Sequence, residues 1–192
     1  MKTLLAGLVL GLSVSAFAAT DVCTLQYNQT GSTLGWTAFK TPKKVGVKGQ
    51  FTNFSIKTEK SDNIDTFLKS MTVEVNTDSV STNDKARDVK IFQFFFKSMN
   101  KGTKITGKVL KVDDIKAEVE FTLNGQTKMV VMGKQYDAAK NTLTLTGALN
   151  VLDFGMKENL SKLTKACAAL HENVTWPDVN IELVASITKS CK

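Results

Sequence analysis

Residues 31–54 read GSTLGWTAFKTPKKVGVKGQFTNF, and this stretch decides the fold. Its first half places Leu34, Trp36 and Ala38 on one phase of an alternating pattern, with small or polar residues between them. Residues 45–51 repeat the pattern. Alternation with a period of two is typical of a β-strand with one face turned away from water. We therefore expect two long strands joined by a turn, at the start of a curved sheet.

Further alternating segments extend this pair. We expect a short strand before it at 22–29, and later strands at 70–76, 104–112, 115–123, 126–136, 141–152 and 179–188. Asn124-Gly125 lies between two of these segments and is a strong β-hairpin signal. About eight strands of this length close into a barrel whose interior holds side chains or one ligand. The sequence therefore predicts a mainly β fold, an antiparallel up-and-down β-barrel of about eight strands with two short helices.

Two helices are expected to interrupt the strands. The first begins at a cap, Asn83 or Asp84, and its apolar stripe carries Val89, Phe92 and Phe96, widened by Ile91 and Phe95. The second is expected at 158–171, and the apolar residues that share one of its faces are Leu160, Leu163, Cys167 and Leu170. Each helix should pack this face against an apolar part of the barrel.

The N-terminal residues have the composition of a secretory signal peptide. Lys2 forms a short positive region before the apolar run 4–14, and Ala16-Phe17-Ala18 fits the small-x-small rule for cleavage. The apolar run is too short for a membrane anchor. We expect cleavage after Ala18, export from the cytoplasm, and a single domain over residues 19–192.

The chain is basic, with 25 Lys and Arg residues against 18 Asp and Glu residues and a formal net charge of +7. The lysines are scattered, and there is neither a dense basic run nor a motif that would stack aromatic side chains on bases. A nucleic-acid partner is therefore not expected. Solvated lysines on the outer face of a sheet explain this charge, and weak attraction to anionic lipid headgroups at a membrane surface is the alternative.

Three cysteines, Cys23, Cys167 and Cys191, remain after the expected cleavage. An odd number in an oxidising compartment allows at most one internal disulfide and leaves one thiol over. Cys23 begins the first strand and Cys191 ends the last, and these two strands pair antiparallel in a closed barrel. We expect a disulfide between Cys23 and Cys191, and a reduced, buried Cys167.

Few residues are suited to catalysis. His171 is the one histidine, and it follows Cys167 by four residues, so both could face the same way on the second helix. This spacing suits a thiolate–imidazole pair or two metal ligands, but two ligands do not complete a metal site. The sequence has no glycine-rich phosphate loop and no Cys-x-x-Cys-His haem motif. We expect no catalytic residue, no metal and no cofactor.

Three short patterns follow one another along the chain. They are Val-x-Gly-x-Phe at 47–51, a helical segment at 80–97 that contains Val-Ser-Thr, Arg-Asp and Phe-Phe-Lys, and Asp-Phe-Gly-Met at 153–156. In this order and spacing they resemble the YceI-like family of lipocalin-like, polyisoprenoid-binding periplasmic proteins. Gly31 and Lys40 occupy places where that family commonly has histidine, so the resemblance does not extend to the headgroup of a ligand.

The resemblance implies a lipocalin-like barrel with a long apolar cavity for an isoprenoid or fatty-acyl chain. Burial of hydrocarbon is worth about 0.8 kcal/mol per methylene, and aromatic and methionine side chains suit such a ligand. Lys40 shares the phase of Trp36 and is expected at the mouth, close to an anionic or carbonyl headgroup. The other residues expected to line the cavity are Leu34, Trp36, Ala38, Val47, Phe51, Met129 or Val131, Leu145, Leu149 and Phe154.

Two functions from different classes stay open. The leading interpretation is a non-enzymatic periplasmic binder or carrier of an amphiphilic lipid of the polyisoprenoid, isoprenoid quinone or fatty-acyl type. The alternative is a small extracytoplasmic enzyme or redox accessory that uses Cys167 and His171. Pairing of two copies through an exposed first helix, as a homodimer, is a further expectation from the resemblance.

Overall fold

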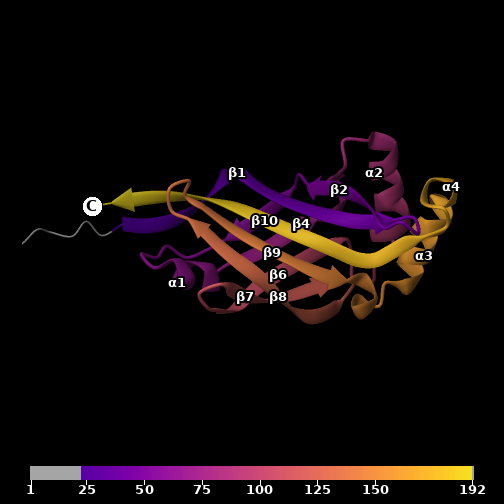
Figure 1. Ribbon diagram of the computed structural model, residues 1–192. Coiled ribbons are helices and arrows are strands. Elements are labelled where there is room, and N and C mark those ends of the chain that lie inside the picture. Colours follow the sequence, from indigo (N-terminus) through magenta and orange to yellow (C-terminus); the bar gives the residue numbers. More distant parts are fainter. Residues whose placement is uncertain (1–22, 192) are drawn as a thin grey trace, which may run out of the picture.

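The computed structural model describes residues 23–191 and consists mainly of one antiparallel β-sheet (Figure 1). Its strand order is β3-β4-β6-β7-β8-β9-β10-β1-β2-β5. The strands are β1 (Cys23–Lys40), β2 (Val45–Phe51), β3 (Phe54–Lys57), β4 (Thr72–Asn76), β5 (Val80–Ser81), β6 (Lys104–Val112), β7 (Lys116–Leu123), β8 (Gln126–Asp137), β9 (Thr142–Asn150) and β10 (Thr175–Cys191). The expected antiparallel barrel class is confirmed. Ten strands replace the expected eight or so, since β2 and β3 are halves of one bent segment and β5 has only 2 residues.

The sheet curls into a half-barrel. β3 stands at one edge of the strand order and β2 with β5 at the other, although only Thr52 and Asn53 separate β2 from β3 in the chain. The Leu25 N–H donates a hydrogen bond of 2.7 Å to the Ser61 carbonyl, which links β1 to the segment after β3. The sheet therefore surrounds one interior, into which alternate side chains of each strand point.

β1 and β10 are the longest strands and run side by side along the molecule (Figure 1). Their antiparallel register places Cys23 opposite Cys191, and the two sulfurs form a disulfide. The expected disulfide is confirmed, and Cys167 is free and buried as expected. This pairing joins the two ends of the domain at one end of the sheet.

Both long strands extend further than the sequence predicts. The two segments predicted at 22–29 and 31–40 are parts of one continuous strand, described from Cys23 to Lys40, with a register irregularity after Asn28 where Gly31 has a φ of 82°. β10 begins at Thr175 rather than at the predicted 179, and it includes Pro177. The register of β1 with β10 is irregular between Ala38 and Lys40, opposite Pro177. Proline has no N–H to donate, and it is tolerated here because the hydrogen-bond ladder is already interrupted.

Short helices lie at both ends of the sheet (Figure 1). α1 (Ile64–Lys69) lies at the disulfide end. The sequence does not predict α1, because residues 59–68 are mostly polar; Asn63 caps it by accepting hydrogen bonds from the N–H groups of Asp65 and Thr66. The opposite end, called the helical end below, carries α2 (Lys85–Ile91), the π-helix η2 (Phe92–Phe96), α3 (Lys157–Ala166) and α4 (Ala168–His171). The single turn η1 (Thr77–Ser79) connects β4 to β5, and η3 (Val151–Phe154) connects β9 to α3.

The first predicted helix is present as α2 and η2, but its buried face differs from the prediction. Val89, expected on the apolar stripe, is 60% exposed, whereas Phe95 and Phe96 are buried. The Lys97 N–H bonds to the Phe92 carbonyl at 2.8 Å, a five-residue step that is wider than an α-helical turn. This wider turn changes the angular position of the residues that follow, so an α-helical period places the stripe incorrectly.

Asn159 fixes α3 against η2. Its side chain is buried, and its amide donates to the Phe95 carbonyl at 2.9 Å and to Ser98 Oγ at 3.0 Å. The two helical segments therefore form one cap over the end of the sheet. Every helix within residues 23–191 is too short or too polar to cross a membrane. The signal peptide expected at 1–18 lies outside the described residues.

Candidate functional site

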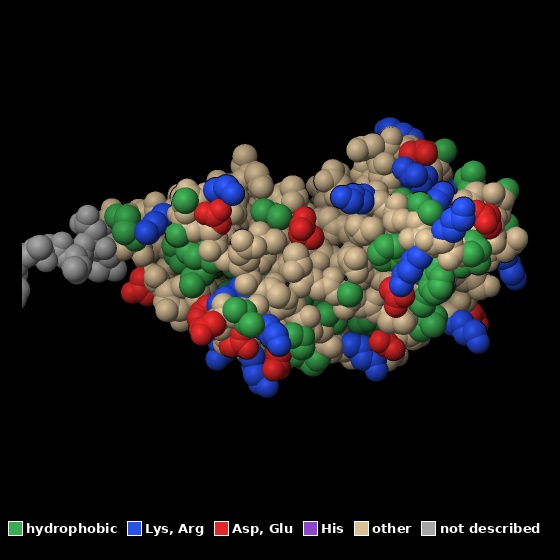
Figure 2. All heavy atoms as spheres, viewed as in Figure 1, with side chains coloured by type: hydrophobic (Ala, Val, Ile, Leu, Met, Phe, Trp, Pro, Cys, Tyr) green, Lys and Arg blue, Asp and Glu red, His purple; other side chains and the backbone are tan. Residues whose placement is uncertain are grey.

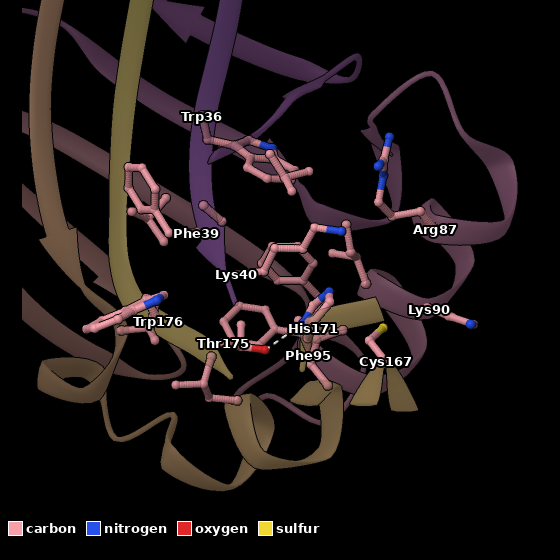
Figure 3. Close-up of a pocket in the computed structure, with 18 of the residues that line it drawn as sticks. Trp36, Phe39, Lys40, Arg87, Lys90, Phe95, Cys167, His171, Thr175 and Trp176 are labelled. Carbon is pink, nitrogen blue, oxygen red and sulfur yellow. Dashed lines mark hydrogen bonds between the residues drawn. The ribbon is translucent and has the colours of Figure 1, made fainter. Parts of the chain in front are cut away.

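The interior of the sheet is hollow at the helical end, where a cavity of about 250 Å³ lies between the strands and the helical cap (Figure 3). The apolar residues that strands contribute to its wall are Trp36, Ala38, Phe39, Val47, Phe51, Ile105, Leu123, Leu149, Trp176, Val179 and Ile181. Those from the helical segments are Ala86, Ile91, Phe95, Phe96, Val151, Leu160, Leu163, Cys167 and Leu170. A concave site with this lining suits an apolar ligand.

The Trp36 indole lies against Gly49, its cross-strand neighbour on β2. A Cβ atom added to Gly49 would lie 2.2 Å from Cζ2 of Trp36, so any larger residue there must displace the indole. The Trp36 N–H is buried and has no hydrogen-bond partner among the described residues. Gly49 therefore holds Trp36 in the cavity wall, a role that the strand pattern alone does not reveal.

Polar groups gather around Lys40 at the mouth of the cavity (Figure 3). Lys40 Nζ donates to the Leu170 carbonyl at 3.2 Å, and His171 Nδ1 is hydrogen-bonded to Thr175 Oγ1 at 2.8 Å. Burial, together with the positive charges of Lys40 and Lys90, lowers the pKa of His171. The imidazole is therefore neutral at neutral pH, and the mouth has a positive potential.

The rim beside the mouth is fixed by contacts between the β1–β2 turn and β10. Trp176 Nε1 donates to the Thr41 carbonyl at 2.8 Å. Lys44 Nζ lies 5.0 Å from the centre of the Trp176 ring and 5.3 Å from that of Phe39, and it also pairs with Asp178 at 3.1 Å. These contacts hold the strand ends that frame the opening.

The family of the chain follows from its sequence match. The YceI-like domain model matches residues 25–186, which is most of the chain. The chain belongs to the YceI-like family. The resemblance seen in the three short motifs is therefore confirmed. No curated protein matches the sequence at a significant level.

Several solved structures share the fold of this YceI-like chain. A polyisoprenoid binding domain from Saccharophagus degradans, implicated in plant cell wall breakdown, has a TM-score of 0.61 and 14% identity over 90% of this chain and 100% of its own. BcnA of Burkholderia cenocepacia has a TM-score of 0.56 and 14% identity over 85% and 99% of the two chains. A variant of the Campylobacter jejuni YceI protein has a TM-score of 0.54 and 22% identity over 77% and 86%. At these identities the likeness establishes the fold.

The structure places six of the predicted lining residues on the cavity, and they are Trp36, Ala38, Lys40, Val47, Phe51 and Leu149. Leu145 and Phe154 do not reach it; they are 2% and 1% exposed and belong to the packed core. Leu34 is half-buried and also packs against that core. On β1 the cavity lining therefore begins at Trp36, whereas the prediction began it at Leu34. Whether the lining residues bind a ligand stays a prediction.

The assignment of Met129 and Val131 to the cavity wall does not hold. Their side chains are 48% and 58% exposed on the outer face of β8, while Val130 and Met132 are buried. Residues 129–132 are all apolar, so both phases of the strand fit an inward face. Alternation alone gives no preference in such a run.

Much of the wall comes from residues that the strand pattern did not single out as lining. Val179 and Ile181 enter it from β10, and Leu160 and Leu163 enter it from α3. The apolar face predicted for 158–171 was a usable signal, because all four of its residues lie on the cavity. The sequence does not predict where this helical face packs relative to the opening of the barrel.

Cys167 and His171 both line the cavity on the side of the helical cap (Figure 3). The helix predicted at 158–171 ends and restarts at Cys167, which separates α3 from α4. Within residues 23–191 no hydrogen bond joins the two side chains, and His171 Nδ1 is hydrogen-bonded to Thr175 Oγ1 instead. The same residues contain no group of three His, Cys, Asp or Glu side chains that could hold a metal ion.

Proposed function

We propose that this YceI-like protein binds and carries an amphiphilic lipid whose long apolar chain occupies the cavity at the helical end. The ligand class is a polyisoprenoid, an isoprenoid quinone or a fatty-acyl lipid. The observation that supports this proposal is the cavity itself, whose walls are aromatic and aliphatic and whose polar groups gather at one side.

The energetics favour a hydrocarbon ligand. Each buried methylene contributes about 0.8 kcal/mol, so about ten of them supply roughly 8 kcal/mol before the cost of ordering the chain. A volume of about 250 Å³ is just below the usual range of about 300–1,000 Å³ for small-molecule sites. A long chain would therefore have its remaining part in the mouth or under a displaced helical cap.

The likeness to known proteins supports the same ligand class. One similar structure is that of a polyisoprenoid binding domain. The compartment proposed is the periplasm, reached through a signal peptide over residues 1–18 and leaving a single domain over 19–192. A disulfide between Cys23 and Cys191 is consistent with an oxidising compartment. The mass of the protein purified from a periplasmic fraction tests the cleavage site after Ala18.

The proposed role is binding, without catalysis. Cys167 is buried in the cavity wall, where its side chain acts as a small apolar group. The ligand is the main proposed partner, with transient contact at a membrane surface during loading and no nucleic-acid partner. A homodimer through α2, whose Val89 is exposed, stays a prediction that analytical ultracentrifugation tests.

Solvent extraction of the purified protein, followed by mass spectrometry, tests the proposal directly. A stoichiometric amphiphilic lipid supports it. An empty protein that also fails to take up added long-chain lipid contradicts it, and a bound metal or an activity lost in His171→Gln would revive the enzyme alternative.

Ala38→Phe tests whether the cavity holds the lipid. The phenyl ring that replaces the Ala38 methyl group should fill space beside Trp36 and lower the lipid content. The expected cost in unfolding free energy is about 1–3 kcal/mol. Val131→Phe is the matched control, because Val131 lies on the outer face of the sheet. Full lipid content in Ala38→Phe would place the ligand elsewhere.

A further inference from the structure

The cavity is apolar, but the charged side chains on its wall are almost all positive. Lys40, Arg87 and Lys90 line it, and Asp84 is the one carboxylate among its lining residues. Asp84 is already engaged as the N-cap of α2, where its side chain accepts a hydrogen bond of 3.1 Å from the Arg87 N–H. The mouth therefore carries an excess of positive charge beside a hydrocarbon-like interior (Figure 3).

Among residues 23–191, Lys40 and Arg87 donate directly only to neutral groups, although Thr82, the partner of Arg87, also bonds to the Asp88 carboxylate. Lys40 Nζ bonds to the Leu170 carbonyl, and the Arg87 guanidinium bonds to Thr82 through its Oγ1 at 2.8 Å and its carbonyl at 3.1 Å. No ion pair among residues 23–191 includes Lys40, Arg87 or Lys90. In a concave site with low-dielectric walls, unpaired cations attract an anion strongly.

The Trp36 indole supplies a second and independent observation. Its N–H is buried beside the cavity without an acceptor, and buried donors in folded proteins almost always have one. Gly49 leaves the indole in this place, so the unpaired donor is built into the strand pair. Figure 3 shows Trp36 reaching from β1 toward the side of the pocket where Arg87 lies. An oxygen atom of a ligand would satisfy this donor.

We infer that the cavity is selective for acidic amphiphiles, in which an apolar chain ends in a carboxylate or a phosphate. The anionic group lies at the mouth near Lys40 and Arg87, and one ligand oxygen accepts from Trp36 Nε1. Lys90 points outward and adds positive charge to this side of the pocket. Charge-assisted hydrogen bonds of this kind are about twice as strong as neutral ones. This inference rests on the proposed function and adds the headgroup class to it.

Matched ligands separate the headgroup from the chain. The delipidated protein is titrated at neutral pH with hexadecanoic acid and hexadecanol, and with geranylgeranyl phosphate and geranylgeraniol, each below its micelle concentration. We expect at least one acid to bind about tenfold more tightly than its own alcohol, and the difference to shrink as salt is added. The two pairs also distinguish a fatty-acid ligand from a prenyl phosphate.

Variants locate the charge. Lys40→Met and Lys90→Met keep most of the side-chain volume and should each reduce the preference for the acid by about threefold or more. Lys48→Met on β2 is the control, because Lys48 is exposed and lies outside the cavity lining. Trp36→Phe should weaken binding of the acid while the protein still folds, as judged by circular dichroism.

Each outcome decides the matter. Equal affinity for acids and alcohols, or an acid preference that survives Lys40→Met and Lys90→Met together, overturns the headgroup inference and leaves the proposed function intact. Failure of all four ligands to bind overturns both. A preference lost equally in Lys48→Met would show a general charge effect and would also overturn the inference.

Discussion

The two ends of the half-barrel are built from the same strands but are filled differently (Figure 1). At the disulfide end, α1 places Phe67 and Leu68 in the interior with 0% exposure, and Met71 follows with 1%. At the helical end, the small Ala38 leaves space that the cap surrounds without filling, while the Trp36 indole occupies the room over Gly49. Whether a barrel interior becomes core or cavity therefore depends on which side chains enter it from outside the sheet.

The charge distribution follows the same division. Figure 2 shows basic side chains gathered over the helical end of this face, close to exposed apolar side chains. The segment 83–101, which forms much of the cap, has five Lys and Arg residues and two Asp residues. The filled end serves stability and the hollow end is available for a ligand, and the following predictions test that division.

The largest effect is expected from opening the disulfide. Cys23 and Cys191 are 168 residues apart, and in the chain-entropy model a loop of this size contributes about 5 kcal/mol to the free energy of unfolding. The Cys23→Ser, Cys191→Ser double variant should lose about 2–5 kcal/mol in chemical denaturation. It should keep its lipid content below its unfolding transition, because the bridge lies at the end opposite the cavity. Loss of lipid from the folded double variant would show that the two ends are coupled.

Truncation of one leucine at each end compares them directly. Leu68→Ala removes a fully buried side chain and should cost about 2–5 kcal/mol of unfolding free energy. Leu163→Ala should cost less than half as much, because Leu163 is half-buried and already borders empty space. Equal losses in urea titrations would mean that the helical end is packed as tightly as the other.

A pair of glycine variants tests the position of Trp36. Gly49→Ala should push the indole into the cavity, lowering lipid content and costing about 1–3 kcal/mol. Gly35→Ala is the control, because a Cβ there meets its nearest atom at 3.8 Å. Tryptophan emission in a Trp176→Phe background reports the change. An unchanged emission spectrum in Gly49→Ala would contradict the packing described.

The smallest effect concerns pH. The pKa of His171 is lowered in the folded protein, mainly by burial, so the unfolded chain takes up the proton first as the pH falls. The folded state should therefore lose stability below about pH 6.5, the ordinary value for histidine, until the pH passes the folded pKa. Above that value the stability difference between the wild type and His171→Gln should be constant. His171→Gln should lack this acid-side loss and keep its lipid content; a parallel pH profile in both proteins would contradict the assignment.

The sequence by itself determined the β class, the strand pairing and the disulfide. Alternation over 34–38 and 45–51 is a local property with a period of two, so it identifies strands before any contact is known. Asn124-Gly125 fixes its hairpin through positive φ angles, 55° and 73°, that these residues adopt readily. The expectation for Cys23 and Cys191 needed only that the first and last strands be neighbours.

Only the tertiary structure decided which residues face the cavity and that a cavity exists. Residues 129–132 are apolar on both phases, so the packing of β8 against its neighbours, and not its pattern, turns Val130 inward. The π-turn of η2 moves the apolar stripe of the first helix, and α1 arises from a polar segment with a good cap. The empty space itself is a difference between the volume that the sheet surrounds and the summed volumes of side chains from distant segments. Local sequence patterns do not predict this volume difference, because it depends on how α1, α2 and α3 pack on the sheet.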